Sequence, residues 1–117
     1  LARLLAEGNI VAVQGDRVVH DVSPMEVEVE SGLTMRLPKG PLFLARATDA
    51  PCFPLFIVRD GWRRYRVIAL PEVALPPRIR GADDDAAKVW AATIFQVMRR
   101  HWSQWYVFEP LLTRRAG

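Results

Sequence analysis

At 117 residues, half of them hydrophobic and a quarter charged, the chain has the length and composition of one folded domain. Its formal net charge of +3 suits an anionic small molecule, phospholipid headgroups or nucleic acid about equally well. The single cysteine, Cys52, excludes an internal disulfide and a multi-cysteine zinc site, and no apolar run approaches the ~20 residues of a membrane-spanning helix. The pattern opens in mid-helix at Leu1, so we expect residues 1–117 to be a single-domain fragment of a longer protein.

The first predicted elements are a helix over residues 1–9 and a buried strand over residues 10–16. The leucines of the helix share one face, and Gly8 and Asn9 are typical of a C-terminal cap. The short apolar run that follows is typical of a buried strand. A helix followed at once by such a strand indicates the start of an α/β unit.

A β-hairpin is predicted next. Residues 25–31 alternate strictly between apolar and polar side chains, which places the valines on one face of a strand. The other face carries three glutamates: Glu26, Glu28 and Glu30. Ser31 and Gly32 supply a turn, and residues 33–38 alternate again.

Two helices and a second hairpin complete the pattern. Pro41 suits the first turn of a helix, and residues 52–71 are typical of two strands joined near Asp60 and Gly61. Three aspartates at 83–85 open the longest helix, where they complement the helix dipole. Its apolar stripe consists of Ala87, Trp90, Ala91, Ile94, Val97 and Met98. We therefore predict an α/β fold, a mixed sheet with hairpins flanked by helices.

None of the common catalytic motifs is present. The sequence lacks a phosphate-binding glycine loop, His-Glu-x-x-His, Gly-x-Ser-x-Gly and Cys-x-x-Cys. His20 and His101 have no partners at metal-ligand spacing, so we expect no metal site. Cys52 lies in an apolar segment and is expected to be a small core thiol rather than a nucleophile.

Asp16 and Arg17 follow the predicted buried strand directly. Ligand sites in α/β sheets lie at the carboxyl ends of strands, where these two residues fall. They form either a salt bridge at the end of the strand or a site in which the planar guanidinium of Arg17 binds a phosphate or carboxylate.

Two further groups of charges have both a structural and a functional interpretation. The hairpin glutamates are either a solvated strand face or include one carboxylate turned into a cleft toward a cationic partner. Lys39 and Gly40 form either a plain turn or an anion contact at a helix start. The aromatic residues after Arg99 and Arg100 are mainly core, with lipid or acyl-chain contact as the alternative.

Taken together, "VAVQGDR", a hairpin, "LPKGPLFLARATDAPCFPLFIVRDGWRRYRVIALPEV", a helix and "WSQWYVFEP" resemble the C-terminal half of the lysophospholipid-acyltransferase-like superfamily. Within it, the pattern is most similar to the bacterial lipid A biosynthesis (lauroyl/myristoyl) acyltransferases. The resemblance runs from about Gly8 to Pro110 and consists of order and spacing. The Pro-x-Gly-Pro helix start followed by the Ala-Pro-x-x-Pro strand is its most specific part.

The resemblance implies transfer of a fatty acyl group from an acyl carrier protein or coenzyme A thioester to a lipid or glycolipid hydroxyl. It implies no cofactor besides that thioester, no nucleic acid, and a peripheral place on the cytoplasmic face of the inner membrane. The catalytic histidine of the family lies in His-x4-Asp/Glu, which this chain lacks, since Met25 stands five positions after His20. We expect that motif upstream of Leu1, and the fragment alone to be inactive.

Carried over residue by residue, the resemblance places Asp16 and Arg17 in the active-site cleft, with Lys39 and Gly40 as a headgroup or phosphate contact. It makes Glu28 a supporting carboxylate for the catalytic histidine, with Glu26 and Glu30 as alternatives because the residues before Gly32 depart from the family pattern. The alternative to an enzyme is a non-catalytic α/β module that binds anionic lipid or a protein partner.

Overall fold

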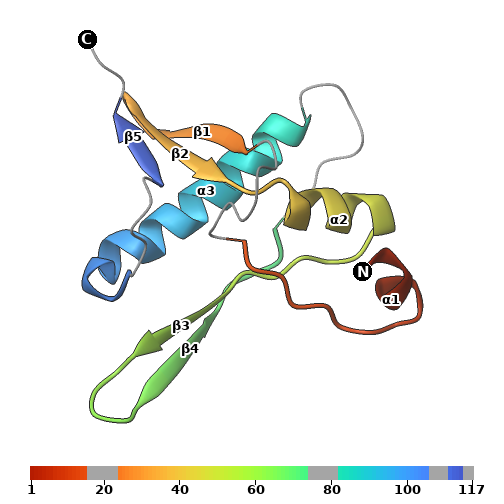
Figure 1. The fold of residues 1–117 in the computed structure, drawn as a ribbon, viewed down its shortest axis with the longest axis horizontal. Helices are drawn as coiled ribbons and strands as arrows, with labels where there is room; N and C mark the ends of the chain where they lie inside the picture. The colour runs from red at the N-terminus through yellow and green to blue at the C-terminus, as the bar shows by residue number, and fades with distance from the viewer. Residues whose placement is uncertain (16–23, 74–81, 106–110, 115–117) are drawn as a thin grey trace.

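A computed structural model of the protein describes residues 1–15, 24–73, 82–105 and 111–114 (Figure 1). Its helices are α1 (Ala2–Ala6), α2 (Gly40–Thr48), α3 (Ala82–Arg100) and the short 3-10 helix η1 (Trp102–Gln104). Its strands are β1 (Met25–Glu30), β2 (Leu33–Leu37), β3 (Leu55–Arg59), β4 (Tyr65–Ala69) and β5 (Leu112–Arg114). They form a three-stranded sheet of order β1-β2-β5 and a separate two-stranded sheet, β3-β4.

The first hairpin forms as the alternation predicts. β1 pairs antiparallel with β2, with Val27 opposite Met35 and Met25 opposite Leu37. Val27 is buried while the glutamates of β1 are exposed, because neighbouring side chains of a strand point to opposite faces. Gly32 closes the turn with φ +75°, a conformation that glycine adopts without steric cost.

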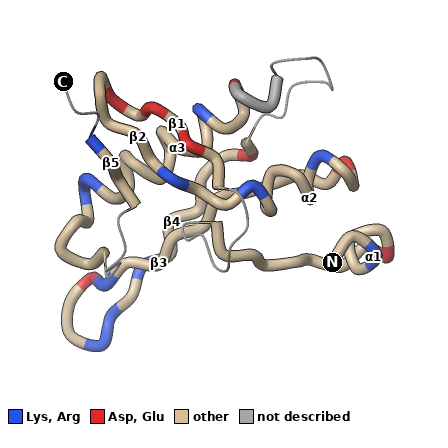
Figure 2. The backbone as a smooth tube through the Cα atoms, turned by 45° about the horizontal axis from the view of Figure 1, so that its top comes forward, with Lys and Arg blue, Asp and Glu red and all other residues tan. Residues whose placement is uncertain are grey.

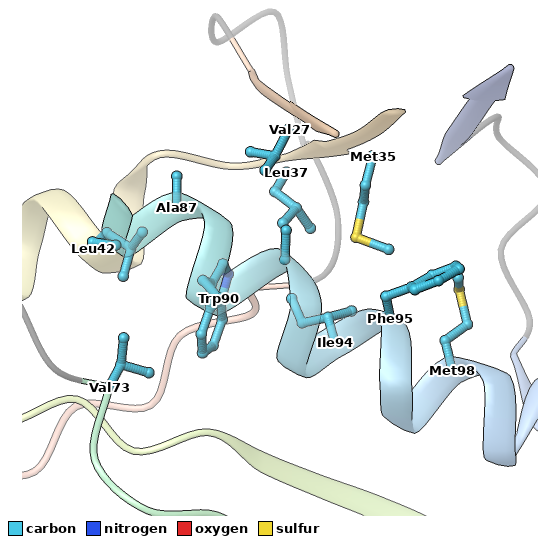
Figure 3. Packing of buried hydrophobic residues seen from close by; sticks show 12 residues of the cluster. Val27, Met35, Leu37, Leu42, Val73, Ala87, Trp90, Ile94, Phe95 and Met98 are labelled. Carbon is cyan, nitrogen blue, oxygen red and sulfur yellow. The ribbon is translucent and has the colours of Figure 1, made fainter. Parts of the chain in front are cut away.

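The core lies between this sheet and α3, which crosses its apolar face (Figure 1). All six residues of the predicted stripe on α3 are buried, so that prediction is confirmed. Figure 3 shows Trp90 and Ile94 of α3 facing Leu37 of β2, with Leu42 of α2 at one end of the cluster. Met35 and Leu37 have no exposed surface, which makes them the centre of the core.

The N-terminal predictions are confirmed only in part. α1 has five residues, and the amides of Gly8 and Asn9 donate to the carbonyls of Leu5 and Leu4, which is the expected C-terminal cap. The buried strand over 10–16 is wrong for the part described, because residues 10–15 form no strand and Ile10 is 99 % exposed. An apolar run becomes a strand only beside a partner strand, and none of the described strands pairs with it.

The second hairpin projects away from the rest of the molecule (Figure 1). The radius of gyration is 15.1 Å, above the roughly 13 Å of a compact chain of this length. The predicted reversal near Asp60 and Gly61 is confirmed, and the turn spans 60–64, where the amide of Asp60 donates to the carbonyl of Arg64 at 2.8 Å. Gly61 takes φ +112°, which only glycine adopts readily.

The fold is α/β, as predicted, but its sheets are two small antiparallel ones rather than one mixed sheet. Hairpins bring consecutive strands together in antiparallel pairs, and no described helix connects two parallel strands. β5, a strand of three residues that the sequence did not indicate, extends the first sheet beside β2.

Candidate functional site

Asp16, Arg17 and His20 lie outside the described residues, so their predicted roles stay predictions. The described chain before them ends at Gly15, which packs directly against the indole of Trp90. A Cβ at position 15 would clash with that ring. Gly15, the residue before the Asp-Arg pair, is therefore held against the core by its contact with Trp90.

Each of the three hairpin glutamates has a partner within the fold. The carboxylate of Glu28 accepts the backbone N–H of Gly32 at 2.8 Å and so holds the turn. Glu30 pairs with Arg99 of α3 at 2.6 Å, and Glu26 lies 3.8 Å from the guanidinium of Arg36 across the strand pair. These contacts relieve the repulsion among three like charges on one strand face.

The register separates Glu28 from the predicted anion contact. Glu28 lies opposite Thr34, next to the turn, whereas Lys39 follows the far end of β2. The strand from Thr34 to Leu37 alone covers about 10 Å. Of the three glutamates, Glu26 lies nearest in register to Lys39, because its partner is Arg36.

Lys39 and Gly40 begin α2, as the sequence indicates. Lys39 is the N-cap residue, its carbonyl accepts the amide of Phe43 at 3.0 Å, and both Lys39 and Gly40 are exposed. Among the described residues, no side chain caps this end of the helix, and a Cβ at Gly40 would meet nothing within 4 Å. The helix start is thus open to solvent, with a lysine beside it.

Cys52 is half-buried rather than fully buried. Burial raises the pKa of its thiol, and the nearby charge of Glu72 raises that pKa further. A thiol held protonated at neutral pH is a poor nucleophile. The raised pKa argues against a nucleophilic role for Cys52, whereas its partial exposure departs from the buried core position that the sequence predicts.

An exposed, strongly basic surface lies on the second hairpin, for which the sequence predicts two strands and a turn but no site. Residues 53–69, which we call the arginine hairpin, include Arg59, Arg63, Arg64 and Arg66, all of them exposed. The guanidinium groups of Arg59 and Arg63 both lie over the ring of Trp62, at 6.0 and 5.5 Å from its centroid. The signal in the sequence was "RDGWRRYR", four arginines and two aromatic residues within eight positions.

Among the described residues, no three His, Cys, Asp or Glu side chains are grouped so as to hold a metal ion. In the same part of the chain, no helix is both long enough and apolar enough to cross a membrane. Comparison of the chain with family models, with curated proteins and with solved structures finds no match.

Proposed function

We propose that this chain is part of a lipid acyltransferase domain that transfers a fatty acyl group from an acyl thioester to a lipid or glycolipid hydroxyl. The observation that carries the proposal is the order of sequence features between Gly8 and Pro110. The Pro-x-Gly-Pro segment that starts α2 and the Ala-Pro-x-x-Pro segment that leads into β3 are its most specific parts.

In the proposed reaction, a histidine on the N-terminal side of Leu1 removes the proton from the acceptor hydroxyl. The hydroxyl oxygen attacks the thioester carbonyl, and the thiol leaves as the new ester forms. Arg17 and the start of α2 at Lys39 and Gly40 hold the anionic headgroup of the acceptor or the phosphate of the donor. The reaction takes place at a membrane surface, on the cytoplasmic face of the inner membrane.

The second candidate is a non-catalytic module that binds anionic lipid or a protein partner. One observation favours it: Glu26, Glu28 and Glu30 all have structural partners within the hairpin or on α3. A carboxylate that already binds an arginine or a turn amide has fewer acceptor positions left for a catalytic histidine. Under this alternative, the open start of α2 binds an anion without any reaction.

The test is the full-length gene and its protein. The enzyme proposal expects His-x4-Asp/Glu upstream of Leu1, and release of free thiol from an acyl thioester when a lipid acceptor is present. Replacing that histidine with alanine should abolish the release, and mass spectrometry should find the acylated lipid only with the unchanged protein. In the same protein, Arg17→Ala should lower transfer strongly without changing the thermal unfolding midpoint.

A full-length protein without the motif and without thiol release would overturn the enzyme proposal in favour of the binding module. Turnover by the 117-residue chain alone would contradict the placement of the base. Normal transfer by a folded Arg17→Ala variant would remove Arg17 from the site.

A further inference from the structure

The arginine hairpin exposes one largely apolar face, with Arg59 at its turn end. Side chains alternate between the two faces of a strand, and the register places Leu55 opposite Ala69, Ile57 opposite Val67 and Arg59 opposite Tyr65 on the same face. The large side chains of this face are uncovered: Leu55 is 63 %, Ile57 72 %, Tyr65 71 % and Val67 58 % exposed.

The opposite face is the one that joins the hairpin to the body. Val58 on that face is buried, and Phe56 packs against the core cluster. The exposed face is therefore not simply the consequence of a hairpin detached from the fold. A contiguous apolar surface of this kind is typical of a binding site.

The net charge of the protein is concentrated on the same hairpin. Residues 53–69 contain four arginines and one aspartate, and the rest of the chain has equal numbers of basic and acidic residues. Figure 2 shows these basic positions gathered around the hairpin turn, with the single acidic one among them. Two of the arginines, Arg59 and Arg63, lie over the ring of Trp62, so two cationic groups stand beside an exposed indole.

We infer that the arginine hairpin is a docking surface for an anionic phospholipid bilayer. The arginines at the turn meet lipid phosphates, Trp62 and Tyr65 lie at the level of the headgroups, and Ile57 and Val67 reach toward the acyl chains. Aromatic residues with one apolar and one polar side are enriched at that level of a membrane. The inference rests on the proposed function for its choice of lipid, since an enzyme acting on lipid has to reach it at the surface.

Two other occupants fit the surface less well. Nucleic acid would satisfy the arginines and stack on the aromatic residues, but it would leave the aliphatic pair Ile57 and Val67 in water. A second copy of the chain would cover the aliphatic face, but it would bring two arginine clusters together. In a bilayer of anionic lipid, the phosphates pair with the arginines of the turn and the acyl chains cover the apolar face.

The experiment measures co-sedimentation of the 117-residue chain with two kinds of vesicle. One consists of phosphatidylcholine alone, and the other of phosphatidylcholine mixed with phosphatidylglycerol. No acyl donor is present, so the result does not depend on catalysis. We expect binding to the mixed vesicles that weakens as salt is raised, with little binding to the neutral ones. We also expect a blue shift of tryptophan emission that is lost in Trp62→Phe.

Matched pairs of variants locate the surface. Arg63→Gln with Arg64→Gln should weaken binding about twenty-five-fold, at about fivefold for each arginine near an anionic surface. Lys88→Gln with Arg100→Gln removes the same charge from exposed positions on α3 and should leave binding within about twofold, since these positions lie off the docking surface. Ile57→Thr with Val67→Thr should weaken binding about tenfold or more, whereas Val89→Thr on α3 should not.

Equal loss in the hairpin and α3 charge variants would overturn the inference, because it would show attraction by net charge alone. Unchanged binding in the Ile57/Val67 variant would overturn the insertion of the apolar face. Preferred binding of single-stranded RNA over mixed vesicles, or a dimer in solution that vesicles do not displace, would assign the surface to another occupant. Vesicle binding without acyl transfer by the full-length protein would sink the proposed function and leave the docking surface in place.

Discussion

The side-chain amide of Gln104 holds both backbone groups of Arg59. Its Oε1 accepts the N–H of Arg59 at 2.6 Å, and its Nε2 donates to the carbonyl of Arg59 at 3.0 Å. The amide thus occupies the free edge of β3 as a neighbouring strand would, at the point where β3 enters the turn. Through this contact, η1 fixes the direction of the arginine hairpin relative to α3.

The first prediction concerns this pair of hydrogen bonds. Gln104→Ala should loosen the turn end of β3 and raise the hydrogen-exchange rate of the Arg59 amide about tenfold, since two hydrogen bonds are worth about 1–2 kcal/mol together. Gln96→Ala removes an exposed glutamine from the middle of α3 and should leave that rate unchanged. An Arg59 amide that exchanges equally fast in both variants would mean that the contact does not hold the hairpin.

The helices and strands were predictable where the hydrophobic periodicity covers a whole hairpin or a whole amphipathic helix. Alternation over residues 25–37 and the stripe on α3 specify both the element and its buried face. The apolar run at 10–15 failed because a strand also depends on a partner that a local pattern does not reveal. The same limit applies to the arginine hairpin, whose apolar residues alternate in the same way whether or not anything covers them.

The second prediction concerns the centre of the core. Leu37 has no exposed surface and packs between the first sheet and α3, so Leu37→Ala should lower the free energy of unfolding by about 2–5 kcal/mol. Val89→Ala, at a half-exposed position on α3, should cost less than about 1 kcal/mol. Chemical denaturation of both variants measures the difference, and a similar cost at the two positions would contradict the placement of the core.

The third prediction concerns the ion pair between Glu30 and Arg99, at 2.6 Å with both side chains half-exposed or more. A double-mutant cycle with Glu30→Gln and Arg99→Gln should give a coupling free energy of about 0.2–1 kcal/mol that falls as salt is raised, because exposed pairs are screened by solvent. A coupling that persists unchanged at high salt would indicate a desolvated pair instead.

The site predictions depended on contacts between distant parts of the chain. The sequence alone does not distinguish the roles of Glu26, Glu28 and Glu30, because alternation places all three on one face of the strand. Their partners differ because Arg99 comes from α3, Arg36 from the neighbouring strand and Gly32 from the turn. No spacing rule within β1 reveals those partners, whereas the exposed helix start at Lys39 follows from the local Pro-Lys-Gly-Pro pattern alone.

The fourth prediction concerns Cys52, whose thiol pKa is raised first by burial and then by Glu72. Since a higher pKa leaves less thiolate at neutral pH, alkylation by iodoacetamide should be slower than for a free cysteine, and its rate should rise only at higher pH. Glu72→Gln should move that rise to lower pH but not to the position of a free cysteine, because burial is the larger cause. An unchanged pH–rate profile in Glu72→Gln would show that the carboxylate does not act on the thiol.

The fifth prediction separates docking from stability at the tip of the hairpin. Arg63 holds a left-handed conformation, with φ 54°, that costs a non-glycine residue about 1–2 kcal/mol. Arg63→Gly relieves that cost, so stability should stay level or rise by up to about 1 kcal/mol after the greater freedom of glycine in the unfolded chain is offset. Vesicle binding should nevertheless fall about fivefold, because one arginine is lost from the surface.

Arg64→Gly is the matched control for this prediction. It removes the same charge from the next position, where no left-handed conformation has to be relieved, so it should lower stability by about 0.5–1 kcal/mol. Binding to mixed vesicles should fall by the same factor in both variants. If binding instead followed stability and improved in Arg63→Gly, the arginines would serve only to shape the turn, and the docking surface would lose its electrostatic basis.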